Sequence, residues 1–198
     1  MKIRISIFAV AAGFAVLGAS ASASAANLIK DGSFEKPAVG EGELTRYSTG
    51  QSIGPWQVVG DSGTVDVFGA GFTFGGCNFP AKKGKQQLDL TGASDSATGV
   101  QQVIKTRAGT TYDLSLYIGS INSSCIDGAT STVNVFVDGT QLTSFVYTVK
   151  KQGTTSSWKK FSTSFQATQS STTIAFINGD PSNDTYNGID GVTVKPAQ

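Results

Sequence analysis

Apolar residues in this chain recur at every second position rather than at the helical period of about 3.6, so the chain is limited to strands that bury one face. In the segment 111–118, Tyr112, Leu114, Leu116 and Ile118 share one phase, and the other phase is mostly polar. No segment after residue 26 has an amphipathic helical repeat. The pattern predicts an all-β chain.

A β-hairpin is the clearest local prediction. Val133–Val137 alternates in the same way, Asp138 and Gly139 can adopt the positive φ of a tight turn, and Leu142–Val149 supplies the returning strand. Clusters of Gly, Ser, Asn and Asp separate the other strand-like runs, and short, frequent strands of this kind predict a two-sheet sandwich. Further strands are expected at Trp56–Val59, Thr64–Phe68, Gln86–Leu90, Val100–Ile104, Lys159–Phe165, Thr172–Ile177 and Gly188–Val194.

The first 26 residues are typical of a secretory signal peptide. Lys2 and Arg4 form a short basic start, an apolar stretch follows, and the run ends in small residues before Asn27. The apolar stretch is shorter than the ~20 residues that a membrane span needs. We therefore expect cleavage before Asn27, one folded domain at residues 27–198, and a periplasmic or extracellular bacterial protein without a membrane span.

The composition disfavours several classes of function. The chain has no histidine, which removes histidine-based catalytic relays and histidine zinc sites. Its 15 basic and 14 acidic residues are balanced, and loss of Lys2 and Arg4 with the signal leaves 13 basic residues. A neutral chain without a basic run gives no footprint for nucleic acid. We predict that the protein is neither a nucleic-acid binder nor an enzyme.

Cys77 and Cys125 are the only cysteines of the chain. In an oxidising compartment, a disulfide between them is the economical interpretation, and a reactive or metal-bound thiolate is the alternative. Cys77 lies in a long, glycine-rich segment, residues 69–85, which we expect to be a functional or disulfide-pinned loop. Glu41 and Glu43 form an acidic stretch that we interpret as solvated rather than as a catalytic pair.

The two ends of the domain carry motifs of a known family. Asp31-Gly32-Ser33-Phe34-Glu35 opens the domain, and Tyr186-Asn187-Gly188-Ile189-Asp190 is followed by alternating valines. With the intervening pieces 88–92, 99–103 and 108–116, these motifs resemble the bacterial choice-of-anchor C type domain and the related domain of unknown function 642. The resemblance implies a single jelly-roll β-sandwich, galactose-binding-domain-like, that binds cell-wall or other polysaccharides without catalysis.

The resemblance also implies a structural calcium near the joined terminal strands. On this sequence its ligands would be Glu35 and Asp190, with carbonyl groups and water supplying the other oxygens. The alternative is that both are ordinary hydrogen-bonding groups at strand ends. Gly191 departs from the Asp or Asn of many relatives, and the segment 180–184 is expected to be a turn.

Sugar binding needs an aromatic face for the pyranose ring and polar groups for its hydroxyls. Tyr117 and Phe136 lie on the polar phase of their strands, so each is a candidate for an outward-facing platform. Trp56 and Trp158 are expected to pack in the core or at an edge, and Phe145 shares a phase with Tyr147. The remaining candidates, each of which could instead be a packing residue, are Phe72, Phe74, Asn78, Asn122 and Tyr147.

Two functions follow from these observations. The first is a secreted, noncatalytic carbohydrate-binding protein whose partner is a cell-wall, capsule or matrix polysaccharide. The second is a structural or adhesive matrix protein that acts through protein contacts, including self-association, because unprotected sheet edges can pair between copies.

Overall fold

The structure is a computed structural model that describes residues 25–180 and 186–198. Within these two ranges the regular elements are all β-strands, and no helix there is long and apolar enough to cross a membrane. The strands are β1 (Leu44–Ser48), β2 (Ser52–Ile53), β3 (Trp56–Gly60), β4 (Thr64–Phe68), β5 (Thr73–Phe74), β6 (Cys77–Asn78), β7 (Gln87–Asp89), β8 (Thr98–Lys105), β9 (Thr111–Ser120), β10 (Thr130–Val137), β11 (Thr140–Thr148), β12 (Ser157–Gln166), β13 (Ser171–Asn178) and β14 (Gly188–Pro196).

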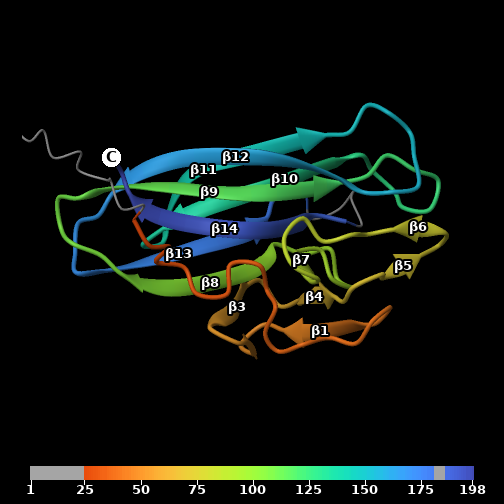
Figure 1. Ribbon diagram of the computed structural model, residues 1–198, viewed down its shortest axis with the longest axis horizontal. Helices are drawn as coiled ribbons and strands as arrows, with labels where there is room; N and C mark the ends of the chain where they lie inside the picture. Colours follow the sequence, from red (N-terminus) through yellow and green to blue (C-terminus); the bar gives the residue numbers. More distant parts are fainter. Residues whose placement is uncertain (1–24, 181–185) are drawn as a thin grey trace, which may run out of the picture.

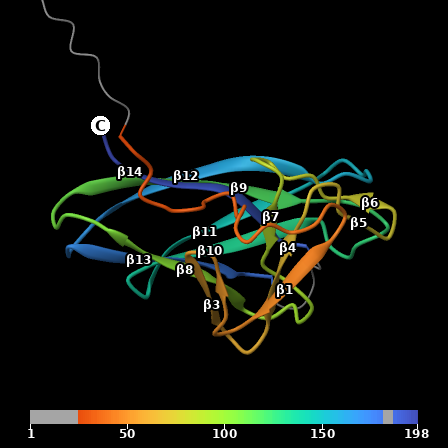
Figure 2. The same cartoon turned by 60° about the horizontal axis from the view of Figure 1, so that its bottom comes forward.

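Two six-stranded sheets stack as a jelly-roll sandwich (Figures 1 and 2). The first sheet has the strand order β1-β4-β7-β14-β9-β12, and the second has the order β11-β10-β13-β8-β3-β2. Every pairing between these strands is antiparallel. The all-β prediction and the sandwich are therefore confirmed.

The core lies between the sheets, on the phase that the alternation predicts. Leu114, Leu116 and Ile118 of β9 are fully buried, and Val133 and Val135 of β10 face them from the second sheet. One row of core residues crosses four strands of the first sheet in register: Val67, Leu88, Ile189 and Ile118. Because side chains alternate along a strand, the residues next to this row point to the outer face of the sheet.

The predicted hairpin is confirmed as β10 and β11. Asp138 and Gly139 adopt φ values of +49° and +79°, which allow the tight reversal. The register shifts after Val135, so Leu142 has no partner on β10 and β11 carries a bulge. Trp56 is buried in the core, as predicted, and its Nε1 donates to the carbonyl of Asp31 at 2.9 Å.

The segment 69–85 is not wholly irregular, because β5 and β6 pair within it as a small hairpin. This hairpin packs over a second apolar cluster, separate from the main core, on the outer side of the first sheet. The cluster consists of Phe68, Phe72, Cys77, Phe79, Ile121 and Tyr186. The segment therefore covers one end of the first sheet.

The predicted disulfide is present. It joins Cys77 of β6 to Cys125 in the loop between β9 and β10, across 48 residues and with the Cα atoms 6.2 Å apart. The bond ties two loops to each other that share no strand pairing. The predicted export signal falls almost entirely outside the described residues, as do residues 181–184 of the predicted turn.

Removal of the disulfide by the double substitution Cys77→Ser and Cys125→Ser should lower the free energy of unfolding by about 4 kcal/mol, because the unfolded chain regains the freedom of a 48-residue loop. Urea unfolding of the variant and of the native protein, without reductant, measures this. A loss below about 1 kcal/mol would contradict the prediction.

Candidate functional site

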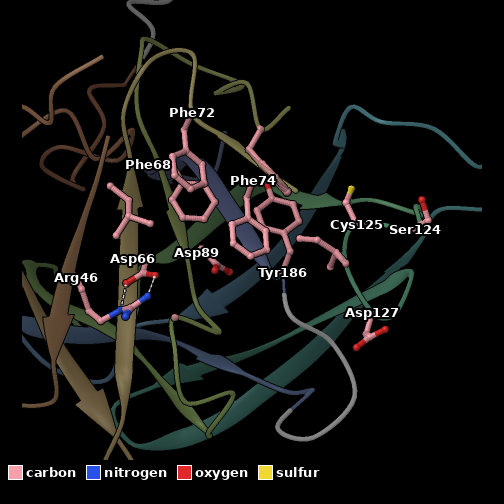
Figure 3. A pocket seen from close by; sticks show the side chains of 14 residues that line it. Arg46, Asp66, Phe68, Phe72, Phe74, Asp89, Ser124, Cys125, Asp127 and Tyr186 are labelled. Atoms are coloured by element: carbon pink, nitrogen blue, oxygen red, sulfur yellow. Dashed lines mark hydrogen bonds and ion pairs between the residues drawn. The ribbon is translucent and has the colours of Figure 1, made fainter. Parts of the chain in front are cut away.

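A cavity of about 490 Å³ opens on the outer side of the first sheet (Figure 3). We call it the aromatic cavity. Strands β1, β4 and β7 form its floor, the segment 69–79 forms one wall, and the loop that carries Cys125 forms another. Its lining residues are Leu44, Arg46, Asp66, Phe68, Phe72, Phe74, Phe79, Asp89, Gly92, Ser124, Cys125, Ile126, Asp127 and Tyr186.

Aromatic rings make up the wall. Phe68 and Phe72 stack with their ring centroids 4.2 Å apart, and Phe79 meets Tyr186 edge to face at 4.8 Å. Phe74 stands at the rim with 61% of its surface exposed, which is unusual for a phenylalanine without a ligand. The rings therefore offer an apolar face that is fixed by ring contacts at its base and open at its rim.

Three charged side chains lie in one row across the floor. The ladders pair Arg46 with Asp66 and Asp66 with Asp89, so β1, β4 and β7 each contribute one residue. The Arg46 guanidinium donates to both carboxylate oxygens of Asp66, at 2.8 and 2.7 Å. Asp66 is buried, whereas 46% of the Arg46 side chain is exposed and leaves N–H donors for a ligand.

Asp89 is the deepest acid of the floor. Its Oδ1 accepts hydrogen bonds from the Asn187 N–H at 2.9 Å and from the Thr91 hydroxyl at 2.9 Å. Burial raises the pKa of Asp89 to about 7, the hydrogen bonds from Asn187 and Thr91 oppose the rise, and the Asp66 charge adds to it. The carboxyl group is thus held in a largely water-free place.

The structure brings together only some of the residues predicted for sugar binding. Phe72 and Phe74 line the aromatic cavity, and Cys125 lies beside them. Asn78 and Asn122 lie outside it and hold loops: the Asn78 side chain donates to the Thr154 carbonyl at 3.3 Å, and that of Asn122 to the Val149 carbonyl at 3.2 Å.

Tyr117 and Phe136 do point outward, but they lie on different sheets and hence on opposite faces of the sandwich. They cannot form one site. Tyr147 faces inward and packs against the core, and its hydroxyl lies 2.9 Å from Ser157 Oγ. Phe145 shares this inward phase and contacts Phe161. A role for Tyr147 as an outward platform does not fit this position.

Tyr117 lies beneath two ammonium groups. Lys82 Nζ is 5.2 Å and Lys83 Nζ is 5.8 Å from the centre of its ring. Trp158 also lies on the outer phase of its strand, opposite Gly119, and its Nε1 donates to the Pro80 carbonyl at 3.0 Å. These contacts hold the segment 80–83 over the middle of the first sheet.

Glu35 and Asp190, the predicted calcium ligands, both bind the backbone of one loop. Asp190 Oδ2 accepts from the N–H groups of Lys82 and Lys83 at 2.7 and 2.6 Å, and Glu35 Oε1 accepts from those of Lys85 and Gln86. In this arrangement Asp190 Oδ2 and Glu35 Oε1 bind backbone N–H groups of the loop. The described residues contain no group of three or more acidic, cysteine or histidine side chains around a common point, and calcium at this pair stays a prediction.

Four lining residues of the cavity were not predicted from the sequence: Arg46, Asp66, Asp89 and Tyr186. The one available signal was the spacing of aromatic residues in the segment 68–79, which carries four phenylalanines. That signal pointed to the wall of the cavity and not to its floor.

The free energy of unfolding should fall as the pH rises from about 4 to about 7. Burial is the main cause that raises the pKa of Asp89 and that of Asp190 to about 7, whereas these groups titrate near pH 4 in the unfolded chain. Between these values the folded chain binds more protons, so stability decreases with rising pH and levels off above about 7. Urea unfolding across this range measures the slope, and the variant Asp89→Asn should reduce it; a rising slope would refute the assignment.

Solved structures of other proteins have a similar architecture. A cyclase from Fischerella sp. in its apo form is 20% identical, with 89% of this chain and 100% of that chain aligned and a TM-score of 0.64. The Stig cyclase Fisc from Fischerella sp. TAU, in complex with an indole compound, is 19% identical over 88% of this chain and 100% of that one, also with a TM-score of 0.64. The CBM22-1-CBM22-2 tandem domain of Paenibacillus barcinonensis Xyn10C is 16% identical over 81% of this chain and 47% of that one, with a TM-score of 0.50.

At these identities the likeness shows the fold alone. No curated protein matches the sequence significantly. The family model described as "Protein of unknown function (DUF642)" matches residues 27–195, which is nearly all of the predicted mature chain. The chain therefore belongs to the DUF642 family.

Proposed function

We propose that this protein is a secreted, noncatalytic carbohydrate-binding protein and that it holds a sugar residue in the aromatic cavity. The observation that carries the proposal is that phenylalanine side chains and the exposed Arg46 line the same cavity of about 490 Å³. Ligand sites of proteins combine apolar walls with a few fixed polar groups in this way. The disulfide supports secretion, because such bonds persist in oxidising compartments.

The two parts of the cavity suit the two faces of a sugar. The C–H face of a pyranose is apolar and packs on an aromatic ring, which the exposed Phe74 offers at the rim. Sugar hydroxyls accept hydrogen bonds from Arg46 and donate them to the exposed carboxylate of Asp127 on the opposite side. Phe72 lies deeper, against Phe68, and fixes the wall.

The state of the two floor carboxyl groups supports a binding role rather than catalysis. Hydrolysis of a glycosidic bond by a carboxyl pair needs both groups to reach the substrate. Here Asp66 is bound by Arg46 through both of its oxygens, and Asp89 is 2% exposed and receives hydrogen bonds from Thr91 and Asn187. Both are occupied by the protein itself.

The substitution Phe74→Ala should weaken binding of a neutral glycan by about tenfold, because it removes exposed aromatic surface that only a ligand covers. A glycan array and pull-down on insoluble polysaccharides, with calcium and with a chelator, first identify the ligand for residues 27–198. Calorimetry then compares the variant with the native protein.

Val103→Ala is the matched control, because Val103 is 64% exposed on β8 of the second sheet, outside the cavity. The melting temperature should change little in either variant. Equal loss of binding in both, or full retention in Phe74→Ala, would reject the aromatic cavity as the site.

The second candidate function, self-association in a matrix, is favoured by one strand. β11 is an edge strand of the second sheet, has no charged residue in Thr140–Thr148, and exposes Leu142 and Val146 at 36% and 52%. Edge strands of monomeric proteins are usually protected by charges or proline, and here only the bulge at Leu142 interrupts the edge.

If β11 pairs between copies, the oligomer should dissociate in the variant Val146→Lys, because the new charge lies on the pairing strand. Light scattering over a concentration series measures this. A native protein that stays monomeric at all concentrations, or a variant that associates as well as the native protein, would exclude pairing through β11.

A further inference from the structure

A second, larger depression lies on the outer face of the first sheet, over β9, β12 and β14, which run side by side (Figure 1). We call it the lysine groove. It is an open groove of about 970 Å³, and the segment 80–83 stands at the end nearer the aromatic cavity. Its lining includes Lys83, Tyr117, Lys160, Thr193 and Lys195.

Three lysines lie around Tyr117 at this end of the groove: the ammonium groups of Lys82 and Lys83 lie over its ring, and Lys160 is its neighbour on β12 and lines the groove. Lys82 and Lys83 place their Nζ atoms 5.2 and 5.8 Å from the Tyr117 ring centre, and Lys160 is paired with Tyr117 across β9 and β12. The aromatic ring attracts the two ammonium groups through its quadrupole. Tyr117 therefore organises positive charge, and its covered face is not a free platform for a sugar.

The backbone fixes the place of these lysines. Asp190 accepts from the N–H groups of Lys82 and Lys83, so both side chains start from an anchored point. Gly191 has a φ of +59°, and a Cβ there would lie 3.0 Å from Lys83 Cγ and 3.1 Å from Tyr117 Cδ2. The glycine leaves the space that Lys83 uses to reach over the ring.

Among the described residues, no acidic side chain forms a salt bridge with Lys82, Lys83 or Lys160. Within the described ranges the one side-chain ion pair is Arg46 with Asp66, in the other cavity. The carboxylate of Asp190 is engaged by three backbone N–H groups, those of Lys82, Lys83 and Gly191. The ammonium groups are thus available to an anion from outside.

From Tyr117 the groove continues along the strands, over hydroxyl groups, to Asp113 and Lys195. Ser115 Oγ and Thr193 Oγ1 lie 2.9 Å apart in its middle, and Asp113 stands opposite Lys195 at its far end. From Tyr117 to Asp113 the distance along β9 is about 13 Å, at ~3.3 Å per residue. This exceeds one pyranose ring, so the groove suits an oligomer rather than a monosaccharide.

We propose that the lysine groove is a separate binding site for an acidic polysaccharide, with a carboxylate of one sugar residue against Lys82, Lys83 and Lys160 and the following hydroxyls along Ser115 and Thr193. Charge complementarity carries this choice of ligand. The chain as a whole has a net charge of +1, so the lysines are a local site and not the extended basic surface that nucleic acid requires. The proposal does not depend on sugar binding in the aromatic cavity.

The test uses residues 27–198 with three polymers: polygalacturonate, the same polymer with its carboxylates methyl-esterified, and polyphosphate. Calorimetry at low and at physiological ionic strength should show binding of polygalacturonate that weakens with salt, and binding of the ester at least about tenfold weaker. The triple variant Lys82→Gln, Lys83→Gln and Lys160→Gln should lose about tenfold in affinity for polygalacturonate, since each lysine contributes a modest share.

The matched control carries the same loss of charge elsewhere: Lys105→Gln, Lys150→Gln and Lys151→Gln are exposed and line neither depression. It should bind polygalacturonate within about twofold of the native protein. Equal losses in the two triple variants, equal binding of the ester, tighter binding of polyphosphate, or no binding of polygalacturonate would each overturn the proposal. If polygalacturonate fails to bind while a neutral glycan still binds, the groove alone is rejected; if a neutral glycan fails to bind while polygalacturonate still binds, the aromatic cavity alone is rejected.

Discussion

The pairing of β14 with both β7 and β9 is the interaction on which the rest of the structure depends. It joins β1, β4 and β7 to β9 and β12, and without it the first sheet would be two separate ribbons. The contact with β7 is short, because only Gly188 and Ile189 take part in the ladder. It is reinforced by hydrogen bonds that flank it: the Asn187 N–H donates to Asp89, and the Leu90 N–H donates to the Asn187 carbonyl. Buried polar groups with such partners specify one register, since a slip would leave them unpaired.

This one segment also positions both depressions. Tyr186 forms part of the aromatic wall, and Asp190, four residues later, anchors the lysines of the groove. The Tyr186 ring fits against the outer face of the sheet because two glycines there have no side chain. A Cβ on Gly188 would lie 2.3 Å from the Tyr186 hydroxyl oxygen, and a Cβ on Gly119 would lie 2.7 Å from it. Two glycines on neighbouring strands therefore make the space for one ring. The closing segment therefore both joins the two halves of the first sheet and contributes residues to two depressions with different linings.

The alternation of apolar residues predicted the strands and their buried faces, because a strand with one buried face has an apolar residue at every second position. It also predicted the turn at Asp138 and Gly139, whose conformation is local. The floor of the cavity was beyond such reasoning, since Arg46, Asp66 and Asp89 meet only through the registers of β1, β4 and β7. The alternation along each strand likewise shows that Tyr117 and Phe136 face outward, but it does not show on which sheet each residue lies. That depends on strand order, which is set by long-range pairing.

The segment 69–86 explains why the two depressions can differ so strongly while lying on the same face. Its first half carries Phe72, Phe74 and Phe79 and is tied down by the disulfide at Cys77, whereas its second half carries Lys82 and Lys83 and is tied down by Asp190 and Glu35. The two anchors are independent: one is a covalent bond to the loop after β9, and the other is a set of hydrogen bonds from backbone N–H groups to carboxyl groups of the first sheet and the opening segment. Between the two anchors, the Trp158 Nε1–H donates to the Pro80 carbonyl and fixes the middle of the segment. A change at either anchor therefore acts first on its own depression, so the aromatic cavity and the lysine groove can vary separately on one sandwich.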